Sequence, residues 1–247
     1  MLFVLTLKYY GKTDPGKKRL INEDSFAIGP NGIFCAVADG MGGAPAGDIA
    51  SSLFCETSSF IFEGAGTENL EDSLCRVHNV FSAANSRIID HGMKYPRDEG
   101  LGCTAELLTF AQNSYVLGHI GDSRVYRMRK GRLIQLTTDH SFVQYQVGNG
   151  ILRAQQARTH SLRHVLLKAL GINMEPAFDV IEGTLENKDL FLLCSDGLSD
   201  MVEDGRIEEI LSKPMSCELR AEMLIESANE SGGNDNITVV IVSIENL

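Results

Sequence analysis

Three short and almost uninterrupted apolar runs constrain the fold of this chain more than any other feature. They are IFCAVA at 33–38, LFLLC at 190–194 and ITVVIVSI at 237–244. Runs of this length, bounded by Gly, Asp or Asn, are typical of β-strands. A strand with one wet face would alternate apolar and polar residues, so the continuity predicts strands that are covered on both faces. Further strands are predicted at 104–110, 115–120 and 124–128.

Two other stretches have helical spacing instead of strand spacing. One helix is predicted at 74–88, and its apolar face consists of Leu74, Val77, Phe81, Ala84 and Ile88. A second helix is predicted at 217–228, and its apolar face consists of Leu219, Met223, Leu224 and Ala228. A third helix is predicted after Gly47, where Ile49, Leu53 and Phe60 form a broken stripe. Apolar stripes of this kind are expected on helices that cover a core.

The order of these elements predicts the fold class. Strands between 104 and 136 follow one another through short polar connections, which favours antiparallel pairing, and the helices arrive as separate blocks. This pattern indicates an α+β fold rather than alternating βαβ units. The 247 residues are expected to form one domain, 1–247, and the mixed polar segment at 139–175 reads as an insertion with some helix.

Composition excludes several classes of protein. Lys and Arg total 22 against 33 Asp and Glu, a net charge of −11, whereas nucleic-acid binding needs an excess of cations. No apolar run approaches the roughly 20 residues that cross a bilayer, and the amino terminus lacks a signal-peptide pattern. The six cysteines have no CxxC spacing and are expected to be buried free thiols. A cytoplasmic protein without membrane insertion is predicted.

Acidic residues stand where the predicted strands end. Asp39 follows IFCAVA, Asp196 follows LFLLC after one serine, Asp122 follows the strand at 115–120, and Asp235 precedes ITVVIVSI. Each aspartate alone is explained as an ordinary turn former. Strand ends from one core converge on one rim, however, and binding sites favour loops held there. The joint pattern therefore predicts a carboxylate cluster.

Such a cluster needs a compensating cation. Two unit charges about 4 Å apart repel by roughly 4 kcal/mol at an effective dielectric near 20. No Lys or Arg is adjacent in sequence to Asp39, Asp196 or Asp235, and hard divalent ions such as Mg²⁺ and Mn²⁺ prefer oxygen ligands. Two such ions would make the patch attractive to an anion and could activate a water. Gly40 would let a backbone carbonyl approach an ion without a Cβ in the way.

Two competing motifs fail on their residues. The segment GMGGAPAG lacks the third glycine of a dinucleotide fingerprint because Pro45 stands there, and Asp48 follows Gly47 where a P-loop needs lysine. Cys194 precedes Ser195 and Asp196, but it belongs to an apolar run, and a reactive thiol needs a partly exposed, electropositive setting. Nucleotide binding and cysteine catalysis are therefore disfavoured.

At this point the motifs, in order and over nearly the whole chain, resemble the bacterial branch of the metal-dependent PP2C (PPM) phosphatases. The matching segments are Arg19–Asp24, Val37–Gly43, Gly121–Tyr126, Leu136–Ser141, Leu192–Leu198 and Asp235–Thr238. The resemblance implies a four-layer α-β-β-α sandwich of two antiparallel sheets flanked by helices. It also implies hydrolysis of phosphoserine and phosphothreonine by direct attack of a water activated by two Mg²⁺ or Mn²⁺ ions, and a flap at about 145–171.

The same resemblance assigns a role to each site residue. Asp39 would bridge both ions, Asp196 and Asp235 would complete one, and the Gly40 carbonyl would bind the other. Glu23 and Asp24 would act through waters. Asp122, with Asp196 shared, would hold a weaker third ion, and Arg19 would grip the substrate phosphate with its bidentate fork. Arg19, Asp39 and Asp196 form the expected catalytic set.

The chain departs from the family pattern in places. Met41 stands where animal members carry a histidine that is a candidate general acid, so the proton donor stays unidentified. His140 is better explained by structural hydrogen bonding. Cys103 is read as a core substitution, and His160-Ser161 replaces a common His-Pro pair in the flap.

Two other functions remain as alternatives. One is a noncatalytic phosphoprotein-binding regulator with the same fold. The other, a haloacid dehalogenase phosphatase, needs a DxD pattern that Ala38-Asp39 does not supply. Expected partners are a phosphorylated protein and a cognate Ser/Thr kinase. The chain is expected to be a monomer and to act in bacterial kinase/phosphatase signalling.

Overall fold

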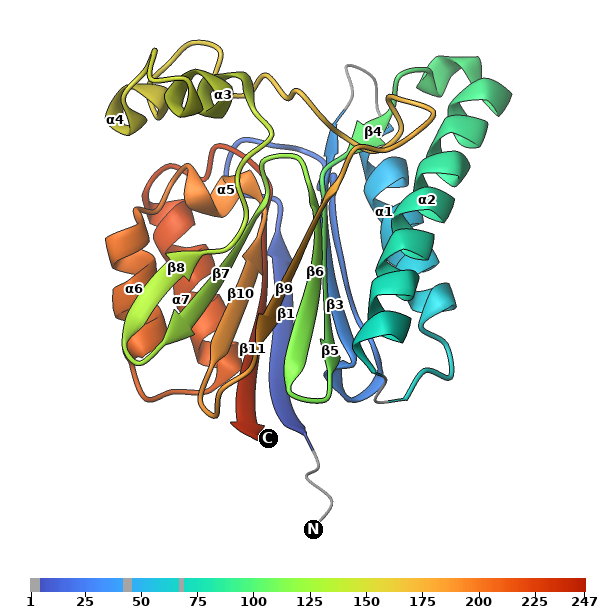
Figure 1. Ribbon diagram of the computed structural model, residues 1–247. Coiled ribbons are helices and arrows are strands. Elements are labelled where there is room, and N and C mark those ends of the chain that lie inside the picture. The colour runs from blue at the N-terminus through green and yellow to red at the C-terminus, as the bar shows by residue number, and fades with distance from the viewer. Residues whose placement is uncertain (1–4, 42–45, 67–68) are drawn as a thin grey trace.

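Two antiparallel sheets packed face to face form the centre of the molecule in the computed structural model, which describes residues 5–41, 46–66 and 69–247 (Figure 1). The first sheet has the order β1 (Thr6–Asp14), β11 (Ile237–Asn246), β10 (Leu190–Cys194), β7 (Arg124–Arg129) and β8 (Arg132–Gln135). The second has the order β2 (Asp24–Ile28), β3 (Phe34–Met41), β5 (Ala105–Ala111), β6 (Ser114–Ile120) and β9 (Asp179–Thr184), with β4 (Gly102–Cys103) paired to β3. Gly42 and Gly43 of the β3 motif lie outside the described residues.

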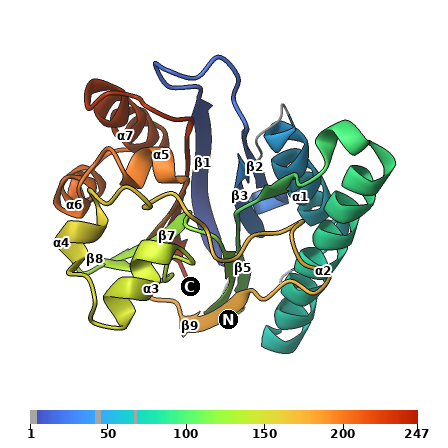
Figure 2. The ribbon, with the colours of Figure 1, turned by 90° about the horizontal axis from the view of Figure 1, so that it is seen from above.

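Helices cover both outer faces of this pair of sheets. α1 (Gly47–Ile61) and α2 (Leu70–Lys94) pack on the second sheet, and α5 (Asp196–Ser199), α6 (Asp204–Ser212) and α7 (Cys217–Glu230) pack on the first. α3 (Phe142–Gly148) and α4 (Ala154–Ala157) belong to the long connection between β8 and β9, above the strand ends (Figures 1 and 2). Two short 3-10 turns are Pro30–Gly32 and Pro96–Asp98. The predicted α-β-β-α sandwich is confirmed.

Alternation along the strands explains why the apolar runs are continuous. In β10, Leu190, Leu192 and Cys194 pack under α6 and α7, whereas Phe191 and Leu193 fill the core between the two sheets. β3 and β11 divide their side chains between two cores in the same way. Side chains of a strand point alternately to opposite faces, so both faces of these strands are dry.

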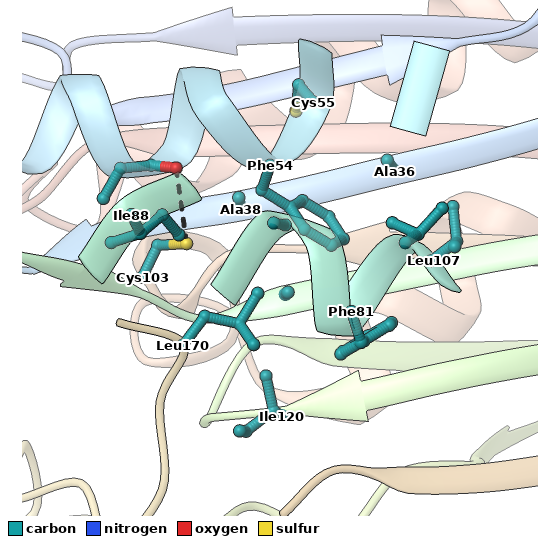
Figure 3. Packing of buried hydrophobic residues seen from close by; sticks show 14 of the residues in the cluster. Ala36, Ala38, Phe54, Cys55, Phe81, Ile88, Cys103, Leu107, Ile120 and Leu170 are labelled. Atoms are coloured by element: carbon teal, nitrogen blue, oxygen red, sulfur yellow. Dashed lines mark hydrogen bonds between the residues drawn. The ribbon is translucent and has the colours of Figure 1, made fainter. Parts of the chain in front are cut away.

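The core between α1, α2 and the second sheet shows how tightly the layers fit (Figure 3). Phe54 of α1 and Phe81 of α2 meet edge to face with ring centroids 5.6 Å apart. Cys103 is fully buried there, and its Sγ lies 3.6 Å from the Ala50 carbonyl oxygen. The interpretation of Cys103 as a core residue is therefore confirmed.

Several details differ from the sequence-based predictions. Phe60 and Leu219, which were expected on buried helix faces, are 75% and 51% exposed, because the inner faces of α1 and α7 are set by Phe54 and Leu224. Cys75 is exposed on α2, unlike the other five cysteines. β1, β2 and β9 were not predicted, because their partly wet faces interrupt the apolar pattern. Within the described residues, no helix is both long enough and apolar enough to cross a membrane.

Gly118 in β6 offers a test of this packing, since a Cβ at this position would lie 2.4 Å from a ring carbon of Phe81 and 2.8 Å from a methyl of Val77. We expect Gly118→Ala to lower the free energy of unfolding by about 2 kcal/mol through overpacking. A Cβ on Gly205 of α6 would meet no atom within 4 Å, so Gly205→Ala should raise stability by about 0.5–1 kcal/mol. Denaturant unfolding of the two variants measures the change in the free energy of unfolding of each, and equal changes would contradict the packing described.

Candidate functional site

Strand ends from both sheets meet around one pocket of about 350 Å³. The β2–β3 pairing places Asp24 opposite Asp39, Asp196 begins α5 just after β10, and Asp235 directly precedes β11. The predicted residues that line the pocket are Arg19, Glu23, Asp39, Gly40, Asp122, Asp196 and Asp235. Asp24 is 7% exposed and is not among the lining residues. The structure therefore brings together every predicted site residue, with Asp24 set behind the others.

The backbone of Asp39 is fixed by a neighbouring threonine. The Asp39 N–H donates to Thr104 Oγ1 over 3.0 Å, and the Thr104 N–H donates back to the Asp39 carbonyl over 2.9 Å. Thr104 Oγ1 also lies 2.7 Å from Ser123 Oγ, next to Asp122. This short chain of hydrogen bonds ties two of the acidic residues together through neutral groups.

Asn236 holds the other side of the pocket. Its Oδ1 accepts from the Glu23 N–H over 2.9 Å, and its Nδ2 donates to the carbonyls of Pro15 and Ile21, each over 3.0 Å. Its own N–H donates to Asp235 Oδ1 over 2.8 Å. One buried amide therefore fixes the loop that carries the residues from Arg19 to Glu23 against the start of β11.

The structure gives Gly40 a packing role in addition to the predicted approach of its carbonyl to an ion. A Cβ on Gly40 would lie 2.1 Å from the Gly47 carbonyl oxygen and 2.7 Å from the Glu23 carbonyl oxygen. The Gly40 N–H also donates to that Glu23 carbonyl over 3.1 Å. The space beside Gly40 is therefore filled by neighbouring backbone, and glycine permits this close approach.

Asp24 is supported by the first sheet although it belongs to the second. Ser195 Oγ donates to Asp24 Oδ2 over 2.7 Å and accepts from the Thr238 N–H over 3.0 Å. The other oxygen, Oδ1, is buried and has no hydrogen-bond partner among the described residues. Burial, opposed by the bonds from Ser195 and Thr238, raises the pKa of Asp24 to about 7.

Arg19 lies at the mouth of the pocket and contacts its acidic wall. Its Nη2 donates to Asp235 Oδ2 over 2.8 Å, and its Nη1 lies 3.9 Å from Glu23 Oε2. The side chain is 48% exposed, so the guanidinium remains within reach of a ligand in solution. Arg19 is therefore more than a solvated member of the basic run Lys17-Lys18-Arg19.

The arrangement fits divalent cations on the chemistry of its donors. Asp196 Oδ1 is buried and lacks a hydrogen-bond partner among the described residues, as Asp24 Oδ1 does. Burial, reinforced by the charges of neighbouring aspartates, raises the pKa of Asp39 and of Asp122 well above the usual range. Crowded carboxylates with unpaired oxygens are the donor set that Mg²⁺ and Mn²⁺ prefer.

Sequence reasoning did not identify His164 as a residue of this region. It comes from the segment between α4 and β9 and lines the pocket. Its Nδ1 lies 3.8 Å from Asp196 Oδ2 and 3.8 Å from Asp200 Oδ2, and the contact with Asp196 raises its pKa. These three residues offer donor atoms within 4.8 Å of one another. A lone histidine in a polar segment carried no signal that could place it beside Asp196.

His140 has the structural role that was expected. Its ring stacks on His119 with centroids 4.6 Å apart, and its Nδ1 accepts from the Gly121 N–H over 3.2 Å. His119 in turn contacts the buried carboxylate of Glu106. Burial, together with the charges of His119 and Lys168, lowers the pKa of His140 to about 4. A neutral His140 therefore holds the loop that carries Asp122.

Comparisons with known proteins agree with this geometry. The protein phosphatase 2C family profile matches residues 16–229. The serine/threonine protein phosphatase PstP of Mycobacterium tuberculosis is 39% identical over 241 residues, 97% of this chain, which spans about half (45%) of that relative's length. The serine/threonine phosphatase stp of Listeria monocytogenes is 34% identical over 235 residues, covering 94% of this chain and 93% of the relative.

Solved structures are similar over almost the entire chain. A crystal structure of the Mycobacterium tuberculosis phosphatase PstP/Ppp superposes with a TM-score of 0.89 at 38% identity, covering 98% of this chain and all of that one. The PstP catalytic domain in complex with two manganese ions gives a TM-score of 0.88 at 37% identity, with the same coverage.

Relief of carboxylate repulsion predicts that metal stabilises the fold. At Mn²⁺ concentrations about 100 times the Kd, the gain should be about 2.7 kcal/mol, seen as a higher Tm. Asp39→Asn should melt above the wild type without metal, because one buried charge is removed, and should gain less from Mn²⁺. A wild-type Tm that saturating Mn²⁺ leaves unchanged would contradict a preformed cation site.

The lowered pKa of His140 leads us to expect a loss of stability on acidification. Its folded pKa of about 4 lies below the ordinary 6.5, so the unfolded chain binds the proton more readily. The stabilisation from neutral His140 is complete above pH 6.5 and is lost as the pH falls toward 4. His140→Asn keeps an acceptor for the Gly121 N–H, so between pH 6.5 and 4.5 it should lose about 2 kcal/mol less stability than the wild type. Urea unfolding at several pH values measures the difference, and parallel curves would refute it.

Proposed function

The chain belongs to the protein phosphatase 2C family, and from this premise we propose that it hydrolyses phosphoserine and phosphothreonine in proteins with the help of divalent cations. The observation that carries the proposal is the pocket into which both sheets deliver their acidic residues, with Arg19 at its mouth. The PstP catalytic domain in complex with two manganese ions supports the same chemistry.

Within this proposal Asp39 would be shared by two ions, Asp196 and Asp235 would complete the ligands of one of them, and the Gly40 carbonyl would serve the other. The ions, which are Mn²⁺ or Mg²⁺, supply Lewis acidity and an activated water when bound. Asp122 and Asp196 would hold a weaker third ion. The unpaired, buried Oδ1 of Asp196 supports its assignment as a ligand.

Glu23 and Asp24 contribute by position rather than by direct binding. The Glu23 carbonyl accepts from the Gly40 N–H, and its own N–H is held by Asn236. Asp24 is fixed by Ser195 below the pocket. The backbone of Glu23 and the carboxylate of Asp24 are therefore held in place beside the pocket, which supports the water-mediated role proposed for both residues.

Arg19 orients the substrate phosphate. In the structure its fork is engaged by Asp235 and Glu23. A cation held by Asp235 would weaken that attraction and leave the guanidinium available to a phosphoryl group, which it can hold with two parallel hydrogen bonds. Met41 lines the same pocket, and its thioether has no proton to donate to the leaving group.

The remaining assignments follow from the family and are part of the proposal. Residues 1–247 act as one domain, residues 145–171 act as a flap, and the chain is a monomer. The substrate is a phosphorylated protein, and a Ser/Thr kinase supplies it. Contacts of this segment with α5, from Arg158 to the Ser199 carbonyl over 3.1 Å and from Arg163 to Asp200 over 3.5 Å, support a flap that closes over the pocket.

Hydrolysis of para-nitrophenyl phosphate and of a phosphothreonine peptide tests the proposal. We expect turnover that needs Mn²⁺ or Mg²⁺ and stops with EDTA. Asp39→Asn and Asp196→Asn should each lower kcat/KM by at least about 100-fold, since each removes a charge from the ion site. Arg19→Lys should mainly raise KM, because a point charge replaces a bidentate fork.

Asp90→Asn, an exposed change of the same kind on α2, is the matched control and should leave the rates unchanged. Full Mn²⁺-dependent turnover by Asp39→Asn would overturn the assignment of the site. A wild-type protein that binds phosphopeptides but shows no EDTA-sensitive hydrolysis would favour the noncatalytic regulator instead. A trapped aspartyl-phosphate would point to the haloacid dehalogenase mechanism.

A further inference from the structure

A second and larger pocket, of about 860 Å³, lies at the opposite end of the first sheet. Its lining includes residues of the β7–β8 turn, the β9–β10 turn, the linker from α6 to α7, and the ends of β1 and β11. These segments lie at the end of the sheet away from α3 and α4 (Figure 1). Leu190 lines it at the start of β10, six residues before Asp196. At about 3.3 Å per strand residue, the two pockets are about 20 Å apart. The second pocket is therefore separate from the carboxylate site.

The charge of this pocket is opposite to that of the chain. Its lining side chains include four cations, Lys8, Lys130, Lys188 and Arg220, and one carboxylate, Glu245, although the chain as a whole carries −11. Buried Leu190, Leu211 and Met128 contribute apolar surface to the same lining. A cationic rim over an apolar floor suits an anionic ligand that also carries apolar groups.

Two of the lysines occupy backbone positions that favour other residues. Lys130 has φ +52° and Gly131 φ +78° in the two-residue turn between β7 and β8, where Asn-Gly is the preferred pair. Lys188 has φ +70° at the third position of a turn closed by the Asp189 N–H and the Glu186 carbonyl over 3.1 Å, where Gly or Asn is preferred. Strained backbone tends to persist at ligand sites, and both strained positions of this pocket, Lys130 and Lys188, carry a lysine.

Two cations of this pocket form ion pairs with carboxylates, and the other two have donor groups without a partner among the described residues. Lys8 Nζ lies 3.0 Å from Glu245 Oε2, and Lys130 Nζ lies 2.8 Å from Glu186 Oε2. Such exposed pairs contribute little and exchange readily. Lys188 has no ion-pair partner within the described part of the chain, and the buried Nε of Arg220 has no hydrogen-bond partner there. Orphaned buried donors are uncommon in folded proteins.

From these features we propose that the pocket is a docking site for an acidic peptide segment of a partner protein, with apolar side chains interleaved among its carboxylates. The four cations come from separate segments around a wide opening, which matches charges spread along an extended chain better than one compact phosphate. Lys8 and Lys130 already bind the carboxylates of Glu245 and Glu186, the same chemical group that an acidic peptide would offer. The inference goes beyond the proposed catalytic function and does not depend on it.

Fluorescence anisotropy with a short fluorescein-labelled peptide of alternating glutamate and leucine tests the proposal. We expect saturable binding that weakens as salt rises. Lys130→Asn combined with Lys188→Asn removes two charges at turns that Asn adopts readily, so the variant should keep or raise the Tm and bind about tenfold more weakly. Amide signals of residues 130–132, 212–213 and 215–217 should shift on binding.

Lys94→Gln, which removes an exposed cation on α2, should bind the peptide as the wild type does. Asp39→Asn should also bind it unchanged, which separates this site from the catalytic one. Absence of saturable binding, or equal binding by the double variant, would overturn the proposal. Tight binding of inorganic tripolyphosphate without peptide binding would also overturn it, because the site would then serve small polyanions.

Discussion

The mutual repulsion of carboxylates at one edge of the paired sheets is the constraint on which the rest of this structure depends. Asp39, Asp122, Asp196 and Asp235 line one pocket, and Asp24 lies behind them. Two unit charges about 4 Å apart repel by roughly 4 kcal/mol at an effective dielectric near 20. A scaffold that holds such a set must be rigid, and three stacked hydrophobic cores supply that rigidity.

The supports of the acidic residues are almost all neutral. Thr104 holds the backbone of Asp39, Asn236 holds the loop before Asp24, and Ser195 holds the Asp24 carboxylate. Hydrogen bonds from neutral groups position a side chain without cancelling its charge. Among the described residues, Arg19 and His164 are the only basic side chains in the pocket lining, and both come from segments outside the sheets. The negative potential therefore stays available to an incoming cation.

Much of the fold and of the carboxylate site could be predicted from the sequence, and the features that could not be predicted were hidden for physical reasons. Strands buried on both faces leave continuous apolar runs, so β3, β10 and β11 and the acidic residues beside them were evident. β1 was not, because it has exposed and partly exposed residues along its length. The reason for Gly40 was also hidden, since it depends on the backbone of Gly47, which no local pattern reveals. His164 was missed for the same reason: its neighbour Asp196 is distant in sequence.

The pairing of β1 with β11 has a consequence for how the protein is made. Lys8 and Glu245, on these two strands, are 237 positions apart, and Asn236 joins loops from both ends of the described chain. Contacts of such long range form late and slow folding. During synthesis the acidic pocket cannot close until β11 has emerged from the ribosome. A nascent chain therefore carries its aspartates apart from one another, and the full electrostatic cost of assembling them is met only in the last step of folding.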